Sequence, residues 1–228
     1  MGGMAPYDSV FSIIGPIMVG PSSSHTAGAA RLGGLARALL GGAPLEAELA
    51  LHGSFAETGA GHGTDRALVA GLLGFSSGDD RLKDAFEHAR EAGLVWKFGT
   101  VNLGPDVHPC SVRFVLRAAD GETLEMVGSS LGGGAVRITS IQGYDVDISG
   151  DYPTLVTVHE DRPGLVQEVS ALLSRYAVNI AFMRVARHHR GAHAFMTLEA
   201  DHDLPPELVT ATRAIPGMVS ARALPRLA

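Results

Sequence analysis

The chain has 228 residues, of which 46% are hydrophobic and 18% charged, and this length accommodates one large or two ordinary domains with buried cores. Its formal net charge of −6 argues against nucleic acid as the main partner, and no apolar run approaches the roughly 18 residues that a membrane span requires. Cys110 is the only cysteine, which excludes a disulfide framework and a four-thiolate cluster, and without a secretory signal after Met1 we expect a cytoplasmic protein.

The chain begins with a segment rich in backbone breakers and small hydroxyls, GPIMVGPSSSHT, at residues 15–26. We predict a loop that leads into a helix over residues 26–40. A helix N-terminus offers unpaired N–H groups, and Ser22, Ser23 and Ser24 add hydroxyl donors, so the segment favours binding of a carboxylate or phosphate. The alternative is that Ser24 only caps the helix and the prolines stiffen its approach.

A second glycine-rich motif, HGSFAETGAGHGTDRA, occupies residues 52–67. We expect a second loop with exposed backbone before a helix that Thr64 or Asp65 caps and Gly74 ends. His62 precedes this cap, and its unperturbed pKa near ~6.5 suits proton transfer. No Gly-Lys-Ser/Thr follows the glycines, which argues against nucleoside triphosphate binding. A purely structural histidine is the alternative.

The first half is also predicted to contain an amphipathic helix at residues 79–92. Four strands are predicted at residues 47–51, 111–118, 123–129 and 135–142. They predict an α+β domain with an antiparallel or mixed sheet. His108 precedes one strand, and the glycines Gly132, Gly133 and Gly134 follow another, where backbone can approach a ligand closely. For the three glycines taken alone, we prefer a plain turn.

The histidines of the first half do not form a known metal-ligand pattern. His25, His52, His62 and His108 lack helical i, i+4 pairing and a carboxylate at a ligand spacing, so we expect no metal held by this chain. No serine lies in a Gly-x-Ser-x-Gly elbow, which disfavours a serine hydrolase.

The second half follows a regular pattern after a turn-rich seam, SGDYPT, at residues 149–154. We therefore place one domain at residues 1–150 and a second at residues 151–228. The second domain is predicted as strand, helix, strand, strand, helix, strand, with Asp161 capping its first helix. The strands are expected at 155–159, 178–187, 192–199 and 218–224, and the second helix opens at Pro205 and Pro206.

The segment HEDRPGLVQEVSALLSRYAVNI, residues 159–180, resembles the ACT domain, a module of amino-acid metabolism. The resemblance implies a ferredoxin-like βαββαβ fold, self-association through sheet or helices, and a small amino acid as ligand. Its ligand loop would include Asp161, Gly164 and Asn179. A packing domain with an empty site remains the alternative, because fold does not fix function.

Four motifs together resemble the β chain of bacterial iron–sulfur L-serine dehydratase in its two-chain form: FSIIGPIMVGPSSSHTAGAARLG, TGAGHGTDRA, the His-Pro before a strand, and SSLGGG. The resemblance spans nearly the whole chain. It implies that L-serine is converted to pyruvate and ammonia, in amino-acid catabolism and gluconeogenesis. It also implies a four-iron cluster held by a partner α chain, so that this chain is active only in the heterodimer. A monovalent cation is a further candidate cofactor.

Carried over residue by residue, the resemblance implies a site made of two groups. The substrate-binding residues would be Ser22, Ser23, Ser24, His25, Thr26, His108, Gly132 and Gly133. The proton-transfer group would be His62, fixed by Thr64 and Asp65. Cys110 departs from the asparagine that we expect in relatives, which leaves substrate affinity and identity open.

The first half also resembles a substrate-binding domain of some phosphoglycerate dehydrogenases. That resemblance implies a different function: a non-catalytic regulatory module that binds serine or a phosphorylated hydroxy acid. Such a binder needs donors for the anion but no titrating base. Substitution of His62 by asparagine should therefore spare a regulatory module and abolish the lyase.

Overall fold

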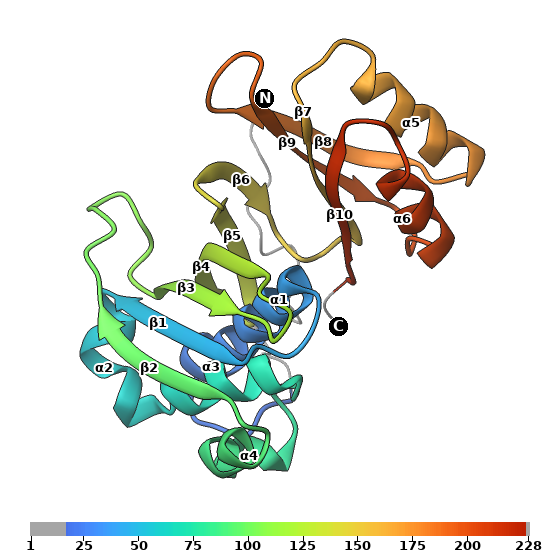
Figure 1. The fold of residues 1–228 in the computed structure, drawn as a ribbon. Coiled ribbons are helices and arrows are strands. Elements are labelled where there is room, and N and C mark those ends of the chain that lie inside the picture. The colour runs from blue at the N-terminus through green and yellow to red at the C-terminus, as the bar shows by residue number, and fades with distance from the viewer. Residues whose placement is uncertain (1–16, 227–228) are drawn as a thin grey trace, which may run out of the picture. The chain divides into compact units, whose positions relative to one another are not determined.

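The computed structural model describes residues 17–226 (Figure 1). Residues 15–16 of the opening segment, and residues 11–16 of the longer family motif FSIIGPIMVGPSSSHTAGAARLG, therefore lie outside the described part of the chain. The chain divides into two compact units, Met1–Arg137 and Ile138–Ala228, and each is described here by itself. This division falls inside strand β5, and the domain boundary at residue 150 stays a prediction.

The first sheet is mixed, one of the two types that the sequence left open, with strand order β2-β1-β3-β4-β5-β6. Its strands are β1 (Glu46–His52), β2 (Val95–Thr100), β3 (Ser111–Arg117), β4 (Thr123–Gly132), β5 (Ala135–Ile141) and β6 (Tyr144–Ile148). β2 runs parallel to β1, whereas β3 pairs antiparallel with both β1 and β4. The sequence analysis missed β2 and β6. β2 lies at the edge of the sheet and is almost entirely exposed, so it lacks the alternating apolar pattern of a half-buried strand.

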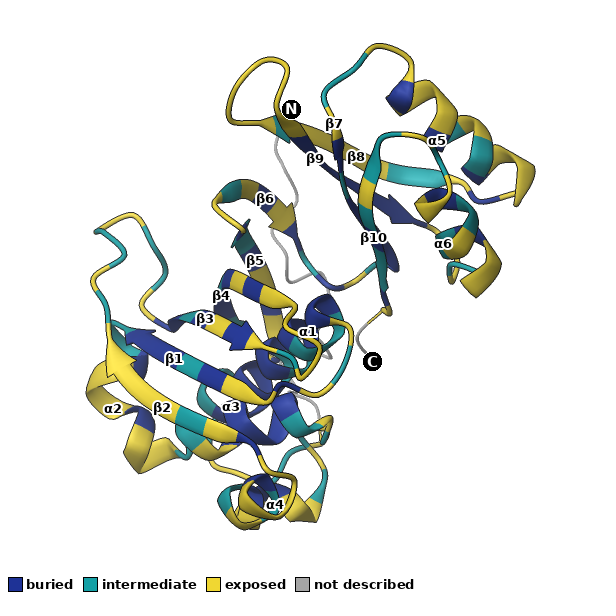
Figure 2. Cartoon of the chain, viewed as in Figure 1, coloured by how far each residue is buried: buried dark blue, intermediate teal, exposed yellow. Residues whose placement is uncertain are grey.

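The helices of the first unit form one layer against this sheet. They are α1 (Ala29–Leu40), α2 (Ser54–His62), α3 (Thr64–Leu73) and α4 (Ala85–Glu91), with a 3-10 turn at Asp80–Asp84. Figure 2 shows α3 mostly buried and α2 mostly exposed. α1 and α3 pack backbone to backbone, because a Cβ on Gly33 would collide with the carbonyl oxygen of Leu68, and one on Gly71 with that of Ala30.

The helix expected over residues 26–40 begins earlier than predicted. A π-helical segment, Ser23–Gly28, precedes α1, and its N-cap is Ser22 rather than Ser24. The Ser22 Oγ accepts a hydrogen bond from His25 N at 3.1 Å. The Ser22 backbone is extended, as an N-cap requires, whereas Ser24 is already inside the helical turn.

The segment before His62 is helix α2, and the prediction of a loop there was wrong. Gly53, at φ 54°, makes the turn into α2, and Gly63, at φ 72°, ends α2 and caps α3. Glycine adopts these positive φ values without a steric cost from Cβ. The glycines therefore serve two helix boundaries, and neither Thr64 nor Asp65 caps α3.

The second unit confirms the predicted βαββαβ plan. Its antiparallel sheet has the order β10-β7-β9-β8. The elements are β7 (Thr154–Glu160), α5 (Leu165–Arg175), β8 (Ile180–Arg187), β9 (His193–Ala200), α6 (Pro206–Arg213) and β10 (Met218–Leu224). The core between sheet and helices includes Leu155, Leu165, Val169, Met196 and Leu208, all completely buried.

One helix start in this unit also differs from the prediction. Gly164, at φ 89°, is the N-cap of α5, and Asp161 is not. The Asp161 Oδ2 instead accepts hydrogen bonds from Arg187 Nη1 at 2.7 Å and from Gly191 N at 3.0 Å. Asp161 therefore fastens the β8–β9 hairpin.

Candidate active site

The π-helical segment directs His25 toward α2. His25 Nε2 lies 3.1 Å from Thr58 Oγ1 and 3.3 Å from Ser54 Oγ, while Nδ1 lies 3.4 Å from Ser22 Oγ. Both ring nitrogens of His25 are therefore next to hydroxyl groups. Burial lowers the pKa of His25, and the neighbouring His62 lowers it further, so the His25 ring is neutral at physiological pH.

His25 and His62 form an imidazole pair with ring centroids 4.9 Å apart. His62 Nδ1 lies 3.0 Å from the backbone oxygen of Thr58. Because a carbonyl oxygen only accepts, Nδ1 carries the hydrogen of the neutral His62 ring, and Nε2 keeps its lone pair. The His62 side chain is exposed, so Nε2 is available to a substrate.

Thr64 and Asp65 are close to His62 in sequence, but they contact other groups. The Thr64 side chain is fully buried against Gly59, and within the described chain its Oγ1 has no hydrogen-bond partner. Asp65 Oδ1 accepts from Arg66 N at 2.8 Å. Within residues 17–226, the hydrogen-bond partner of the His62 ring is the backbone oxygen of Thr58.

The triple-glycine turn contacts the opening segment. Gly133 N donates to Ser23 Oγ at 3.2 Å, and a Cβ on Gly132 would lie 3.5 Å from Ser24 Oγ. Arg31 Nη1 donates to Gly134 O at 2.5 Å and fixes the same turn to α1. The turn between β4 and β5 is therefore held against the hydroxyl cluster.

His108 and Cys110 lie on the loop before β3. His108 Nδ1 accepts a hydrogen bond from Cys110 N at 3.1 Å, and burial lowers the pKa of His108. Burial also raises the pKa of the Cys110 thiol, an effect that a hydrogen bond from Ser54 partly offsets. Since Ser54 also lies beside His25, it connects this loop to the imidazole pair. In the described residues, the hydrogen bonds of His108 go to Cys110 N and Ser111 Oγ, and not to His25 or His62.

A cavity of about 320 Å³ lies beside His62, between the opening segment and the junction of α2 and α3. Thr26 and His62 line it, together with two cationic residues, Arg66 and Lys83. Lys83 pairs with Asp80 at 3.0 Å. The Arg66 guanidinium has one recorded contact among the described residues, a face-on approach to the Phe86 ring at 6.0 Å. The cavity therefore combines an imidazole with two cationic side chains, while the Thr26 hydroxyl donates to His62 O at 3.3 Å.

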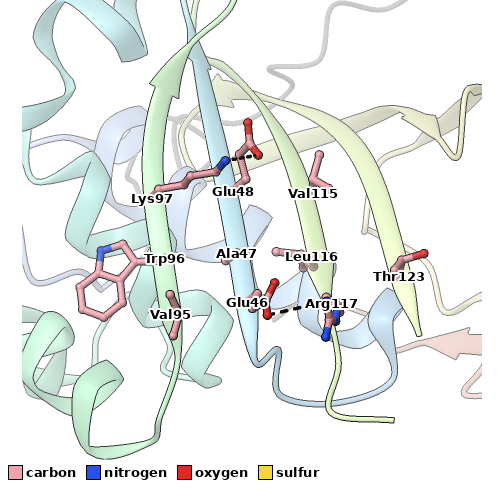
Figure 3. Close-up of a pocket in the computed structure, with 10 residues that line it drawn as sticks. All are labelled: Glu46, Ala47, Glu48, Val95, Trp96, Lys97, Val115, Leu116, Arg117 and Thr123. Carbon is pink, nitrogen blue, oxygen red and sulfur yellow. Dashed lines mark ion pairs between the residues drawn. The ribbon is translucent and has the colours of Figure 1, made fainter. Parts of the chain in front are cut away.

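Figure 3 shows a second pocket, of about 350 Å³, on β1, β2 and β3. Lys97 pairs there with Glu48 at 2.8 Å, and Arg117 with Glu46 at 3.8 Å. None of the predicted site residues lines it, and its charges are already paired. The His25–His62 side of the unit is therefore the candidate active site.

The residues predicted for the ACT ligand loop do not meet within one chain. Asp161 precedes α5, whereas Asn179 follows it and donates from Nδ2 to Asp201 Oδ2 at 2.6 Å. An eleven-residue helix is about 16 Å long, which separates the two side chains. Gly164 lies at the Asp161 end as the cap of α5.

Two residues of the site were missed by sequence reasoning, Ser54 and Thr58. Their signal was the spacing Ser54, Thr58, His62, which is i, i+4, i+8 and places all three on one helix face. The signal was hidden because glycines at 59, 61 and 63 predicted a loop.

Comparisons of the sequence with known proteins identify the family of the chain. The family model described as the serine dehydratase beta chain matches residues 9–92, and that of the ACT domain matches residues 154–217. A probable L-serine dehydratase beta chain from Bacillus subtilis is 41% identical over 213 residues, which is 93% of this chain and 96% of that protein. The chain belongs to the L-serine dehydratase beta chain family. The L-serine dehydratase beta chain of Peptoniphilus asaccharolyticus is likewise 41% identical, over 94% of this chain and 96% of that protein.

Family membership confirms the resemblance and the predicted α+β plus ACT architecture. As an L-serine dehydratase beta chain, the protein is part of an L-serine ammonia-lyase, and a beta chain implies an alpha partner. A D-3-phosphoglycerate dehydrogenase from Archaeoglobus fulgidus is 28% identical over 196 residues, 85% of this chain but 36% of that enzyme. In the described residues no helix is long and apolar enough to cross a membrane.

Proposed function

We propose that this chain binds the carboxylate of L-serine and supplies His62 as the proton-transfer group of the lyase. The observation that carries the proposal is the His62 ring: its Nδ1 lies 3.0 Å from Thr58 O, and the residue is exposed and lines the cavity. Removal of a weakly acidic α-proton needs a base held in one orientation, and this geometry provides it.

The cavity beside His62 supports carboxylate binding. Arg66 lines the cavity and supplies a positive charge, while the Thr26 hydroxyl donates to His62 O at 3.3 Å and fixes the wall on which His62 lies. Hydrogen bonds to a charged acceptor are stronger than those between neutral groups. We propose that the carboxylate binds on the Arg66 side, with the α-carbon toward His62 Nε2. Ser23 and Ser24 lie against Gly133 and Gly132 and do not line this cavity.

His25 has a different role in this proposal. Both of its ring nitrogens face hydroxyl groups of the protein, and its lowered pKa keeps it uncharged. Because both ring nitrogens of His25 are next to protein hydroxyls, we propose that proton transfer falls to His62. We assign His25 to orienting the hydroxyls of Ser22, Ser54 and Thr58.

The donor set of this chain does not fit a four-iron cluster. Its one cysteine, Cys110, is buried with a raised thiol pKa, and the described residues contain no group of three or more His, Cys, Asp or Glu placed to hold a metal. A cluster needs several thiolate ligands. We therefore propose that the cluster of the family belongs to the alpha chain.

The test is to co-express the chain with its alpha partner, purify the complex without oxygen and measure pyruvate formed from L-serine. We expect activity only with both chains, and a loss of about 10²- to 10⁴-fold in kcat for His62→Asn. His202→Asn, which changes an exposed histidine outside the site, is the control. Full activity of the alpha chain alone, or an active His62→Asn complex, would contradict the catalytic role.

The second candidate is a regulatory module that binds serine or a phosphorylated hydroxy acid. The similarity to part of a phosphoglycerate dehydrogenase favours it, because the shared region covers 36% of that enzyme. On this hypothesis the alpha chain is active by itself, this chain shifts only its dependence on serine, and His62→Asn retains the shift.

A further inference from the structure

Thr58 contacts both imidazoles of the site. Its Oγ1 lies 3.1 Å from His25 Nε2, and its backbone oxygen lies 3.0 Å from His62 Nδ1. No other residue in the described chain has a recorded hydrogen bond to both rings. Thr58 is exposed on α2, so its side chain contributes little to the core.

The hydrogen-bond partners of Thr58 determine where its own proton lies. Thr58 Oγ1 is 2.9 Å from Ser54 O, and a carbonyl oxygen only accepts. The Thr58 hydroxyl therefore donates to Ser54 O and presents a lone pair to His25. It follows that His25 Nε2 is the nitrogen that carries hydrogen.

The other side of the His25 ring agrees with this assignment. Ser22 Oγ accepts from His25 N at 3.1 Å and lies 3.4 Å from His25 Nδ1. The Ser22 hydroxyl proton is thus free to point at Nδ1, which has a lone pair in this tautomer. One residue, Thr58, sets opposite tautomers in the two rings: Nε2–H in His25 and Nδ1–H in His62.

We propose that Thr58 is a positioning residue, whose hydroxyl locks the tautomer and orientation of His25 while its carbonyl orients His62, so that His62 Nε2 is the one basic nitrogen of the pair open to substrate. This inference rests on the proposed function of His62. It identifies Thr58 as the residue that gives the two neighbouring imidazoles different roles.

The experiment compares Thr58→Val, which keeps the branched shape but removes the hydroxyl, with Thr58→Ser, which keeps the hydroxyl. Thr210→Val in α6 is the matched control, because Thr210 is also exposed and its Oγ1 donates to the carbonyl four residues earlier, at 3.1 Å, with no imidazole nearby. The full chain is labelled with ¹⁵N-histidine, and the ring nitrogen shifts report each tautomer. The complex with the alpha chain is assayed for kcat and KM.

We expect the wild-type chain to show Nε2–H in His25 and Nδ1–H in His62. In Thr58→Val, His25 should become a mixture of tautomers, because the Ser54 hydroxyl, at 3.3 Å, can then donate to Nε2. The kcat of the complex should fall about threefold to tenfold, the effect of one hydrogen bond, with KM changed less than about twofold. Thr58→Ser and Thr210→Val should match the wild type in both measurements.

Three results would overturn the proposal: an unchanged His25 tautomer in Thr58→Val, a Thr58→Ser chain as defective as Thr58→Val, or a changed tautomer with wild-type kcat. The tautomer measurement needs no turnover, so it remains decisive if His62→Asn shows that the lyase role itself is wrong.

Discussion

His25 is held in a half-buried position where a positive charge is unfavourable. Burial, and secondarily His62, lowers its pKa, and burial does the same to His108. A histidine with a lowered pKa in the folded state binds fewer protons than in the unfolded chain once the pH falls below about 6.5, so stability is lost as the pH falls.

We therefore expect the thermal midpoint to decrease between about pH 6.5 and pH 5, and to decrease less in His25→Asn. Thermal unfolding of both chains across this range, with His189→Asn at an exposed turn position as control, is the measurement. A His25→Asn chain with the full wild-type dependence would show that His25 is not the group responsible.

The Cys110 thiol gives a second prediction at the scale of one residue. Its burial raises the pKa and so decreases the thiolate fraction at neutral pH. Alkylation by iodoacetamide at pH 7.5 should be much slower in the folded chain than in urea-unfolded chain. Equal rates, followed by mass spectrometry, would mean that the loop before β3 opens readily.

Substitutions at two adjacent glycines of α1, Gly33 and Gly34, distinguish the effect of close helix packing from that of helix propensity. A Cβ on Gly33 would collide with the backbone of α3, whereas Gly34 has nothing within 4 Å of an added Cβ. Gly33→Ala should lower the free energy of unfolding by about 1–3 kcal/mol through overpacking. Gly34→Ala should raise it by about 0.5–1 kcal/mol, because alanine favours the helix more than glycine does.

Urea unfolding of the two variants provides the measurement, and they are each other's control because they are neighbours on one helix. If Gly33→Ala proves as stable as Gly34→Ala, then α1 and α3 do not approach as closely as the structure shows.

At the scale of elements, the strands that alternate buried and exposed residues were predicted nearly to their ends. β3 is an example, with Val112, Phe114 and Leu116 inward. The predictions failed where glycine has two possible uses. In α2, Gly59 is buried against Thr64 inside a helix, while Gly53 and Gly63 end the helix on both sides. A local pattern does not distinguish a packing glycine from a loop glycine.

For the whole molecule, we propose self-association through the edge strand β8. β8 ends the sheet of the second unit and exposes Phe182 to 58% and Val185 to 45%. An apolar edge strand is a ready partner for another strand. Within one chain Asp161 and Asn179 are separated, so pairing of two copies would also give the predicted ACT ligand loop a second set of residues.

Val185→Lys should therefore weaken the dimer, because a charge would be placed at the paired edge. Val219→Lys, on the opposite edge strand β10 and also exposed, should leave it unchanged. Light scattering after size-exclusion chromatography of the full chain measures both. A wild-type monomer, or equal weakening by both variants, would contradict pairing through β8.

The sequence by itself determined the two-part organisation, the βαββαβ plan of the second half, and the motifs that gather at the site. These follow from local physics: alternation of apolar residues in strands, apolar periodicity in helices, and turn residues between them. That the serine cluster and the triple-glycine turn share one site was implied only by the family resemblance, and in the structure Gly133 N donates to Ser23 Oγ.

Only the tertiary structure decided which atoms of the site face each other. Thr58 became visible as the residue between His25 and His62 once α2 was seen to be a helix packed beside the π-helical segment. Residues 25 and 58 are far apart in sequence, and the hydrogen bond between them depends on how two helices pack. The tautomers, the lowered pKa of His25 and the position of Arg66 in the cavity all follow from that packing, which no local pattern encodes.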